Sequence, residues 1–524
     1  STLLASSAAS DVYKRQKYTP TKKTEDLKEY FNISSDDEAA LIVDNELSDY
    51  KAKIIDKKIY VDYKFVHDSL NSRFYWDANE NVLLYTTASD IISAAADSNS
   101  YSVTRQTNDF GYPIVKATSD SALIALDYVK QYSNITFKSY DDPARIVITS
   151  KWDEIDSATV SKSTQVRVKG GIKSPILKEV KKDDKITILD SGDKWDKVAT
   201  EDGVIGYIKR KALSESKKTK LTNPDYEEET FTHIKKDKDI CLAWNQVTSQ
   251  SANSKVPQVI SSTKGINVMS PTWFYLNDNN GNLADIASKD YISYCHSQGI
   301  EVWGLFSNFE NTDVDAAYVL THTSTRTTLI NQIMSAAFNY ELDGVNIDFE
   351  NITEAAYGDS YIEFIRELAI KCHNNGISLS VDVTVPASFN KFFNRSDMAN
   401  FADYIVIMGY DEHYKGSDAG SVSSIPWVTE GVESTLKEVP ADQIILGMPF
   451  YTRIWELTPK EDDDAVTDTE DQSKYTVASQ VYSMDAAAAQ LATNNATAAL
   501  DEESGQNYAE WSVSNKLYKA VSYT

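Results

Sequence analysis

One short segment of the chain combines residue types and a spacing that can perform acid–base chemistry, Asp343-Gly-Val-Asn-Ile-Asp-Phe-Glu350. Side chains of a β-strand alternate between its two faces, so Asn346, Asp348 and Glu350 are expected on one face and the apolar residues between them on the other. Burying carboxyl groups in a row is costly unless they are paired or protonated, and packing gives no reason for it. A carboxyl in an apolar setting has a raised pKa and suits a general acid. We therefore expect Glu350 to donate a proton.

The second carboxyl, Asp348, lies two residues before Glu350, about 6.5 Å along the strand. Ordinary glycosidases place their two carboxyl groups on opposite sides of the bond that they cleave. Two carboxyl groups on one strand face do not flank a sugar in this way. A nucleophile must come from elsewhere, and the 2-acetamido oxygen of a substrate is one candidate.

The segment belongs to a region in which apolar, β-rich runs alternate with helical runs. Near-continuous apolar strands joined by helices predict a parallel sheet that is buried on both faces, and their spacing suits a (β/α)₈ barrel of the α/β class. Residue 350 then lies at the carboxyl end of its strand, where barrel active sites are found. The expected strands are 240–244, 266–270, 300–306, 345–350, 377–385, 404–410 and 444–449, with helices that include 324–340, 360–375 and 484–493.

The motif D-G-x-[DN]-x-D-x-E, together with the region 238–520 around it, resembles glycoside hydrolase family 18, the chitinase-like barrels. The resemblance implies that Glu350 protonates the glycosidic oxygen and that Asp348 binds the acetamido N–H and stabilises an oxazolinium intermediate. It implies that Asp343 and Asn346 support these two side chains. No eighth strand is recognised after residue 449, so we expect the barrel to be truncated before strand 8.

Two further segments match motifs of this family. The resemblance implies that Tyr410, in Met408-Gly-Tyr-Asp, binds the acetamido carbonyl and that Asp411 lines the sugar site. Segment 447–453, which ends in Tyr451-Thr-Arg453, matches a second motif, although a threonine replaces its usual glycine. Aromatic side chains at strand ends are expected to stack on sugar rings. On this ground the expected substrate-binding residues are Trp244, Trp273, Phe274, Tyr451 and Trp455. The resemblance adds Met408, Asp411 and Arg453 to the substrate-binding set and Tyr410 to the catalytic set.

Position 346 departs from the family pattern, because the family usually has aspartate there and this chain has asparagine. An amide cannot share a proton with Asp348, so the proton relay beneath the catalytic acid must differ. The asparagine variant is similar to the spore-cortex N-acetylglucosaminidases of the family. This similarity favours peptidoglycan or spore cortex over chitin as the substrate.

Two smaller modules are expected before the barrel. Region 39–152 repeats a strand, an apolar helix and a hairpin, and it resembles the α+β copper-amine-oxidase N-terminal-like domain. Region 160–213 has short strands broken by Gly and Asp turns, and it resembles a small all-β, bacterial SH3-like barrel. The resemblance leaves two roles open, binding of a cell-wall peptide and a passive spacer. Residues 214–237 are expected to be a linker. Residues 1–16 and 521–524 resemble non-native sequence scars.

Composition excludes several other functions. The net charge of −26 opposes binding to nucleic acid, and no apolar run approaches the ~20 residues of a membrane-spanning helix. Three cysteines and six histidines show no metal-ligand spacing, so neither a metal nor a cofactor is expected.

The sequence thus predicts a retaining, substrate-assisted glycosidase acting on N-acetylglucosamine polysaccharide, secreted or associated with the cell wall. The alternative is a non-catalytic, lectin-like or wall-anchoring protein on the same barrel.

Overall fold

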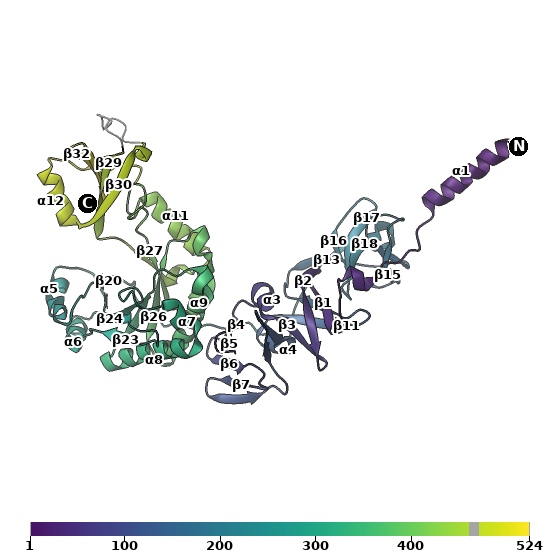
Figure 1. Ribbon diagram of the computed structural model, residues 1–524, viewed down its shortest axis with the longest axis horizontal. Helices are drawn as coiled ribbons and strands as arrows, with labels where there is room; N and C mark the ends of the chain where they lie inside the picture. Colours follow the sequence, from purple (N-terminus) through teal and green to yellow (C-terminus); the bar gives the residue numbers. More distant parts are fainter. Residues whose placement is uncertain (1, 461–470, 523–524) are drawn as a thin grey trace. The chain divides into compact units, whose positions relative to one another are not determined.

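The computed structural model describes residues 2–460 and 471–522. The chain divides into two compact units (Figure 1), unit 1 with residues 1–87 and 91–229, and unit 2 with residues 88–90 and 230–524. Within the described residues, no helix is long and apolar enough to cross a membrane.

Unit 1 begins with helices α1 (Thr2–Tyr18) and α2 (Leu27–Tyr30), and its described residues form three β-sheets. A seven-stranded sheet has the order β11-β12-β1-β2-β3-β10-β9, and a five-stranded meander has the order β4-β5-β6-β7-β8. The strands are β1 (Glu38–Val43), β2 (Glu46–Ile55), β3 (Lys58–Asp62), β4 (Tyr75–Asp77), β5 (Val82–Thr86), β6 (Ile91–Ala95), β7 (Ser100–Val103), β8 (Gln106–Asp109), β9 (Val115–Ala117), β10 (Ala122–Ala125), β11 (Thr136–Tyr140) and β12 (Arg145–Thr149).

The strand–helix–hairpin order occurs twice in this part of unit 1. Strand β3 is followed by α3 (Tyr63–Phe65), η1 (Val66–Leu70) and the hairpin β4–β5. Strand β10 is followed by α4 (Leu126–Tyr132) and the hairpin β11–β12. The first strands of the two copies, β3 and β10, pair with each other antiparallel.

The third sheet of unit 1 is all antiparallel, in the order β15-β14-β18-β17-β16-β13-β19. It extends beyond the expected bounds of 160–213 on both sides, because β13 pairs with β19 and β19 occupies part of the expected linker. Its elements are β13 (Glu154–Thr159), β14 (Thr164–Arg167), β15 (Ile176–Val180), β16 (Lys185–Asp190), β17 (Trp195–Thr200), β18 (Ile205–Lys209), η2 (Arg210–Ala212) and β19 (Lys217–Lys220).

Unit 2 is built on a parallel sheet in the order β20-β21-β24-β25-β26-β27-β28, which confirms the seven expected strands. Its strands are β20 (Leu242–Asn245), β21 (Val268–Pro271), β24 (Glu301–Ser307), β25 (Gly344–Asp348), β26 (Ser378–Thr384), β27 (Tyr404–Met408) and β28 (Ile444–Gly447). A short hairpin, β22 (Phe274–Leu276) and β23 (Leu283–Asp285), attaches to β24 through β22.

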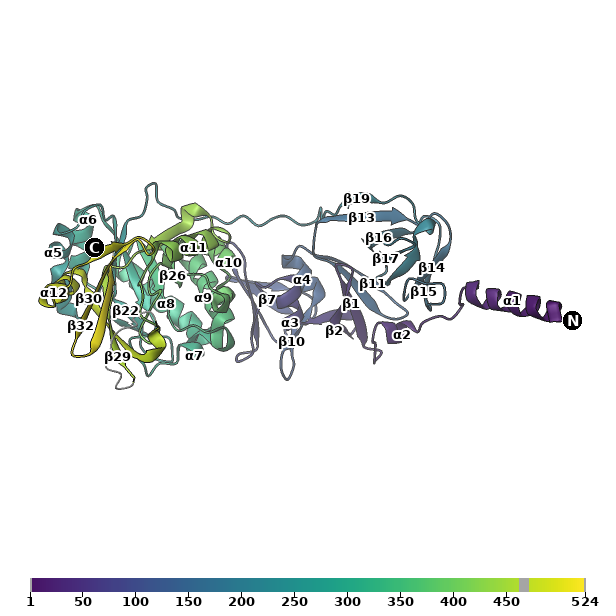
Figure 2. The same ribbon diagram turned by 90° about the horizontal axis from the view of Figure 1, so that it is seen from above.

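Helices connect the parallel strands and cover the sheet (Figure 2). Several of them begin at a side-chain cap, such as Ser288 before α6 and Ser424 before α11. The connecting elements are η3 (Gln250–Lys255), α5 (Val256–Ser261), α6 (Lys289–Ser297), α7 (Ala316–Thr321), α8 (Thr323–Tyr340), α9 (Glu354–Asn374), η4 (Ser388–Phe393), α10 (Arg395–Phe401), α11 (Ile425–Leu436) and η5 (Ala441–Gln443).

The parallel sheet is curled so that its first and last strands approach each other. A Cβ at Gly447, at the end of β28, would lie 2.9 Å from Cη2 of Trp244 on β20. Only glycine leaves room for that ring. Similarly, a Cβ at Gly344 would lie 2.6 Å from the ring of Trp303 on β24, so the glycine at the start of β25 permits close packing there. The described residues thus form a curled, seven-stranded β/α barrel.

The described residues after β28 add a five-stranded antiparallel sheet that the sequence did not predict, in the order β30-β29-β33-β32-β31 (Figure 1). The expected helix at 484–493 is present as α12, and no strand in this segment joins the parallel sheet. The elements are β29 (Tyr451–Pro459), η6 (Gln472–Lys474), β30 (Tyr475–Ser483), α12 (Met484–Thr493), β31 (Ala499–Asp501), β32 (Gln506–Val513) and β33 (Lys516–Ser522).

Candidate active site

Strand β25 presents its side chains in the predicted alternation. Val345 and Ile347 are fully buried, and Phe349 stacks on Phe364 of α9 at 5.4 Å between ring centroids. Asn346 points to the opposite face, because its hydrogen-bond partners lie on β20, β21 and β26. Strand β24 separates β21 from β25 in the sheet, so these bonds cross the concave interior.

Asn346 is fully buried and uses all of its hydrogen-bonding capacity. Its Oδ1 accepts from Trp244 Nε1 at 3.1 Å and from Ser270 Oγ at 3.2 Å. Its Nδ2 donates to Ser380 Oγ at 2.8 Å and to Asp382 Oδ1 at 2.7 Å. The amide therefore ties four strands together beneath the site, and it offers no group that could take up a proton.

Asp348 follows Asn346 on the same face and is largely withdrawn from solvent. Its Oδ1 is buried and has no hydrogen-bond partner among the described residues. Burial is the main cause that raises its pKa to about 7, and the charges of Glu350 and Glu310 raise it further. The Asp348 carboxyl group therefore titrates near neutral pH.

Glu350 lies two residues beyond the end of β25, and it remains accessible to solvent, as a proton donor must. Burial of its carboxyl raises its pKa, and the charges of Asp411 and Glu310 act in the same direction. Its backbone is held by Asn308, whose Oδ1 accepts from the Glu350 N–H at 2.8 Å and whose Nδ2 donates to the Glu350 carbonyl at 2.9 Å. Sequence reasoning did not single out Asn308, although it directly follows β24.

Two neighbouring carboxylates are held in place by hydroxyl groups and a guanidinium. Asp411 accepts a hydrogen bond from the Tyr451 hydroxyl and lies 3.7 Å from the Arg453 guanidinium. Glu310 accepts a hydrogen bond from Ser307 Oγ at 2.5 Å. As fixed negative charges, both favour the protonated form of Glu350.

Tyr410 completes this group of side chains. Its ring packs edge-on against Trp244 at 6.3 Å and against Tyr451 at 6.1 Å between centroids. Burial raises its pKa, as do the charges of Asp382 and Asp348, so the phenol keeps its proton and can serve as a donor. Met408 ends β27 two residues before it and is partly buried.

This arrangement can donate a proton from Glu350 and stabilise positive charge beside Asp348. Residues 307–524, which include Asp348, Glu350 and Tyr410, match the family model described as Glycosyl hydrolases family 18. The chain carries a domain of this family.

Relatives with curated names match shorter stretches of the chain. The uncharacterized glycosylase YvbX of Bacillus subtilis (strain 168) is 25% identical over 194 residues, which are 34% of this chain and 55% of YvbX. The cortical fragment-lytic enzyme of the same organism is 26% identical over 187 residues, 34% of this chain and 43% of that protein. The chain thus spans about half or less of the length of these relatives.

The solved structures that resemble the chain include the Bacillus cereus spore cortex-lytic enzyme SleL. It is 18% identical to this chain with a TM-score of 0.45, and the match covers 54% of this chain and 64% of SleL. The match of residues 307–524 to the family model confirms the family 18 resemblance. The likenesses of 160–213 to SH3-like domains and of 39–152 to amine-oxidase-like domains stay predictions.

Three aromatic residues expected to bind sugar prove to be core residues of the β/α barrel or of the antiparallel sheet that follows it. Trp273 has no exposed surface, and its Nε1 donates to Asn253 Oδ1 at 2.8 Å. Phe274 is 1% exposed and stacks on Phe306. Trp455 is also 1% exposed, lies on β29 and packs in the core of the antiparallel sheet. An aromatic residue at a strand end need not face the site, so this part of the prediction is wrong.

Asp343 lies apart from the other predicted site residues. It precedes β25, and its Oδ2 accepts from the Val302 N–H at 2.8 Å and pairs with His296 at 2.7 Å. Its carboxylate therefore stabilises the amino-terminal end of the sheet and supports Asn346 and Asp348 only through the strand.

The sequence analysis missed Asp382 on β26. Asp382 is 3% exposed, and its Oδ2 is buried with no hydrogen-bond partner among the described residues. Burial raises its pKa well above the ordinary value, and the charge of Asp348 raises it further. The alternation Ser378, Ser380, Asp382 within an otherwise apolar run was the available signal.

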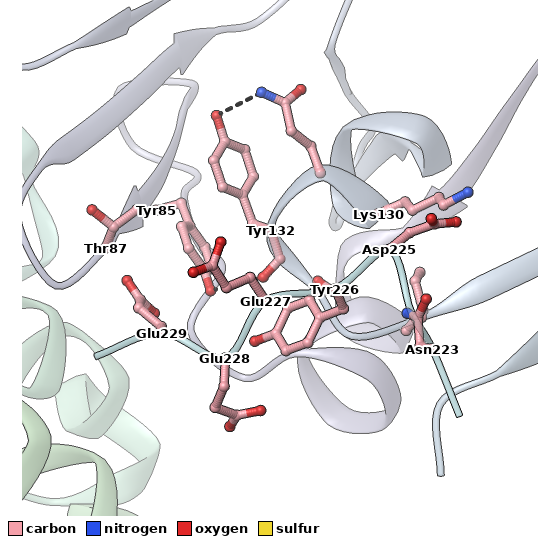
Figure 3. Close-up of a pocket in the computed structure, with 13 residues that line it drawn as sticks. Tyr85, Thr87, Lys130, Tyr132, Asn223, Asp225, Tyr226, Glu227, Glu228 and Glu229 are labelled. Atoms are coloured by element: carbon pink, nitrogen blue, oxygen red, sulfur yellow. Dashed lines mark hydrogen bonds between the residues drawn. The ribbon is translucent and has the colours of Figure 1, made fainter. Parts of the chain in front are cut away.

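Two cavities of unit 1 involve none of these residues. A cavity of about 410 Å³ has Tyr85 and Tyr132 on one side and the acidic segment 225–229 on the other (Figure 3). A cavity of about 740 Å³ is lined by β11, β12, β13 and β16, with Phe137 and Trp152 among its residues. Among the described residues of the chain, no three His, Cys, Asp or Glu side chains are grouped to hold a metal ion.

Proposed function

We propose that this protein is a retaining, substrate-assisted glycoside hydrolase that cleaves β-1,4 bonds after N-acetylglucosamine residues. The observation that carries the proposal is the pair of carboxyl groups on one face at the end of β25, Asp348 and Glu350, each with a raised pKa. A protonated Glu350 supplies the general acid, and its solvent access lets it reach a glycosidic oxygen.

In the proposed first step, Glu350 gives its proton to the glycosidic oxygen as the bond from that oxygen to the anomeric carbon breaks. The acetamido carbonyl oxygen of the same sugar forms a new bond to the anomeric carbon, and a cationic oxazolinium ring results. Asp348 accepts a hydrogen bond from the acetamido N–H and stabilises this cation. The Tyr410 hydroxyl binds the acetamido carbonyl and orients it.

In the second step, Glu350 takes a proton from water as the water oxygen bonds to the anomeric carbon. The bond to the acetamido oxygen breaks, and the product keeps the β configuration. Trp244 is partly exposed beside Tyr410 and offers a surface for the sugar ring. Asp411, held by Tyr451 and Arg453, offers a fixed acceptor for sugar hydroxyl groups.

Peptidoglycan or spore cortex is the proposed substrate, and chitin is the alternative. The asparagine at position 346 and the likeness to a cortical fragment-lytic enzyme support this choice. A secreted or wall-associated location, with unit 1 binding wall peptides, is part of the same proposal.

Product analysis on both polymers tests the proposal. Purified cortex and chitin oligomers are incubated with the protein, products are identified by mass spectrometry, and the first-formed anomer is followed by NMR. We expect β-anomeric N-acetylglucosamine ends, released faster from cortex. An α-anomer would contradict the substrate-assisted mechanism, and binding without any cleavage would favour a lectin.

A further inference from the structure

Asp382 and Asp348 are neighbours on adjacent strands. Strands β25 and β26 are parallel and in register, with Asn346 opposite Ser380 and Ile347 opposite Val381. The next pair in this register is Asp348 and Asp382, and adjacent strands lie about 4.8 Å apart. Both side chains lie on the concave face, since Asn346 on that face donates to Ser380 and to Asp382.

Each of the two carboxyl groups has one buried oxygen without a hydrogen-bond donor, and a single proton between the two oxygens would satisfy both. Asp382 Oδ1 accepts from Asn346 Nδ2 at 2.7 Å. Asp382 Oδ2 and Asp348 Oδ1 are both buried, and neither has a partner among the described residues. Two ionised carboxylates in this position would repel each other and leave both oxygens unsatisfied. A single proton shared by the pair provides a donor for one oxygen and removes one charge.

We propose that Asp382 is a positioning residue that shares one proton with Asp348, in place of the carboxyl group that Asn346 cannot provide. This inference deepens the proposed function and rests on it for its catalytic meaning. The shared proton is held on Asp382, so that Asp348 is the carboxylate and Asp382 the neutral acid. The negative charge then lies next to the oxazolinium ring as that cation forms.

The surroundings keep the proton within the pair. Burial is the main cause that raises the pKa of both groups. The charge of Asp348 further raises the pKa of Asp382, and the charges of Glu350 and Glu310 further raise that of Asp348. Within the part of the chain that the structure describes, no cationic side chain lowers the pKa of either group, whereas Arg326 lowers that of Glu367 and so partly offsets its burial. The other titratable groups that face the pair are Glu350 and Glu310 at the mouth, Tyr361 on α9 and Tyr410 after β27.

Three variants test the shared proton. Asp382→Asn removes the acid but keeps a side chain of similar size. Asn346→Asp combined with Asp382→Asn exchanges the amide and the acid between the two strands. Ser378→Ala is the matched control, because Ser378 faces the same side of β26 but bonds to Ile234 at the other end of the strand.

The first readout needs no substrate. At about pH 8, where ordinary Asp and Glu side chains are ionised, the infrared difference spectrum of wild type minus Asp382→Asn should show the carbonyl band of a protonated carboxyl group. The same difference against Ser378→Ala should be flat. An absent band in the first spectrum would overturn the proposal, and this result does not depend on whether the protein is a hydrolase.

The second readout is the pH profile of kcat. We expect Asp382→Asn to lower kcat at least tenfold and to change the shape of the profile, because a single carboxyl then titrates where a coupled pair did before. The exchange variant should recover most of kcat. A wild-type profile for Asp382→Asn, or an exchange variant no better than Asp382→Asn, would overturn the assignment.

Discussion

The side chain of Asn308 bonds to both backbone polar groups of Glu350, accepting from its N–H at 2.8 Å and donating to its carbonyl at 2.9 Å. These bonds fix the residue just beyond β25, where the next residue, Asn351, has a φ of 59°. The proton donor therefore sits on backbone that is anchored to the end of the neighbouring strand, β24.

Removing this anchor should impair turnover more than binding. We expect Asn308→Ala to lower kcat about 10- to 100-fold with little change in KM, because a misplaced donor loses its alignment with the leaving oxygen. Steady-state kinetics measures both values. Asn311→Ala, which removes an amide from the same loop that bonds to Asn277, is the control and should keep wild-type kcat. A parallel loss in both variants would contradict a specific role for Asn308.

The raised pKa of Asp348 makes stability depend on pH. In the unfolded chain the group ionises near pH 4, whereas in the folded protein its pKa is about 7. Between these values the folded state binds more protons than the unfolded state, so stability falls as pH rises. Asp348→Asn has no carboxyl group to titrate at this position. The difference in the free energy of unfolding between this variant and wild type should therefore shift in the variant's favour from about pH 4 to about pH 7 and then become constant. Urea unfolding at several pH values measures it, and a constant difference would contradict the assignment.

A buried ion pair between α8 and α9 is expected to matter for stability. Arg326 is 0% exposed, and its Nε donates to Glu367 Oε2 at 2.8 Å. Arg326→Met leaves the Glu367 carboxyl buried without its cation, so we expect a loss of about 3 kcal/mol or more in the free energy of unfolding. The solvent-accessible pair Lys235–Asp442 supplies the comparison, and Lys235→Met should leave the unfolding transition of unit 2 almost unchanged. Equal effects of both variants would show that burial is not the cause.

Two tryptophans predicted to bind sugar should behave differently. Trp273 is in the core, so Trp273→Phe should cost about 1–3 kcal/mol of stability and leave KM unchanged. Trp244 is partly exposed beside Tyr410, so Trp244→Phe should raise KM for N-acetylglucosamine oligomers. A raised KM for Trp273→Phe at full folding would contradict its placement in the core.

The sequence predicted the strands of the parallel sheet and the orientation of β25, because both follow from local periodicity. Alternation alone places Asn346 and Asp348 on the face opposite Val345 and Ile347, whatever lies around them. The same alternation of polar and apolar residues occurs at Ser378, Ser380 and Asp382. It would have been enough to predict that β26 carries a second row of polar side chains on one face, although Asp382 was missed.

Other features could not be read from local pattern. Whether Trp273 packs inward depends on its partner Asn253, which lies 20 residues earlier. Asn308 is recognisable only once β24 and β25 are known to be neighbours. The antiparallel sheet after β28 is held by pairing between distant strands, such as β29 with β33, which no short window reveals.

The most direct test of the proposed hydrolase is Glu350→Gln, assayed for reducing-sugar release and, by calorimetry, for binding of an N-acetylglucosamine oligomer. The amide keeps the shape of the side chain but cannot donate a proton to the leaving oxygen. We predict that turnover falls by about 1,000-fold or more while binding stays within a few-fold of wild type. Hydrolysis close to the wild-type rate would contradict the assignment of Glu350 as the general acid.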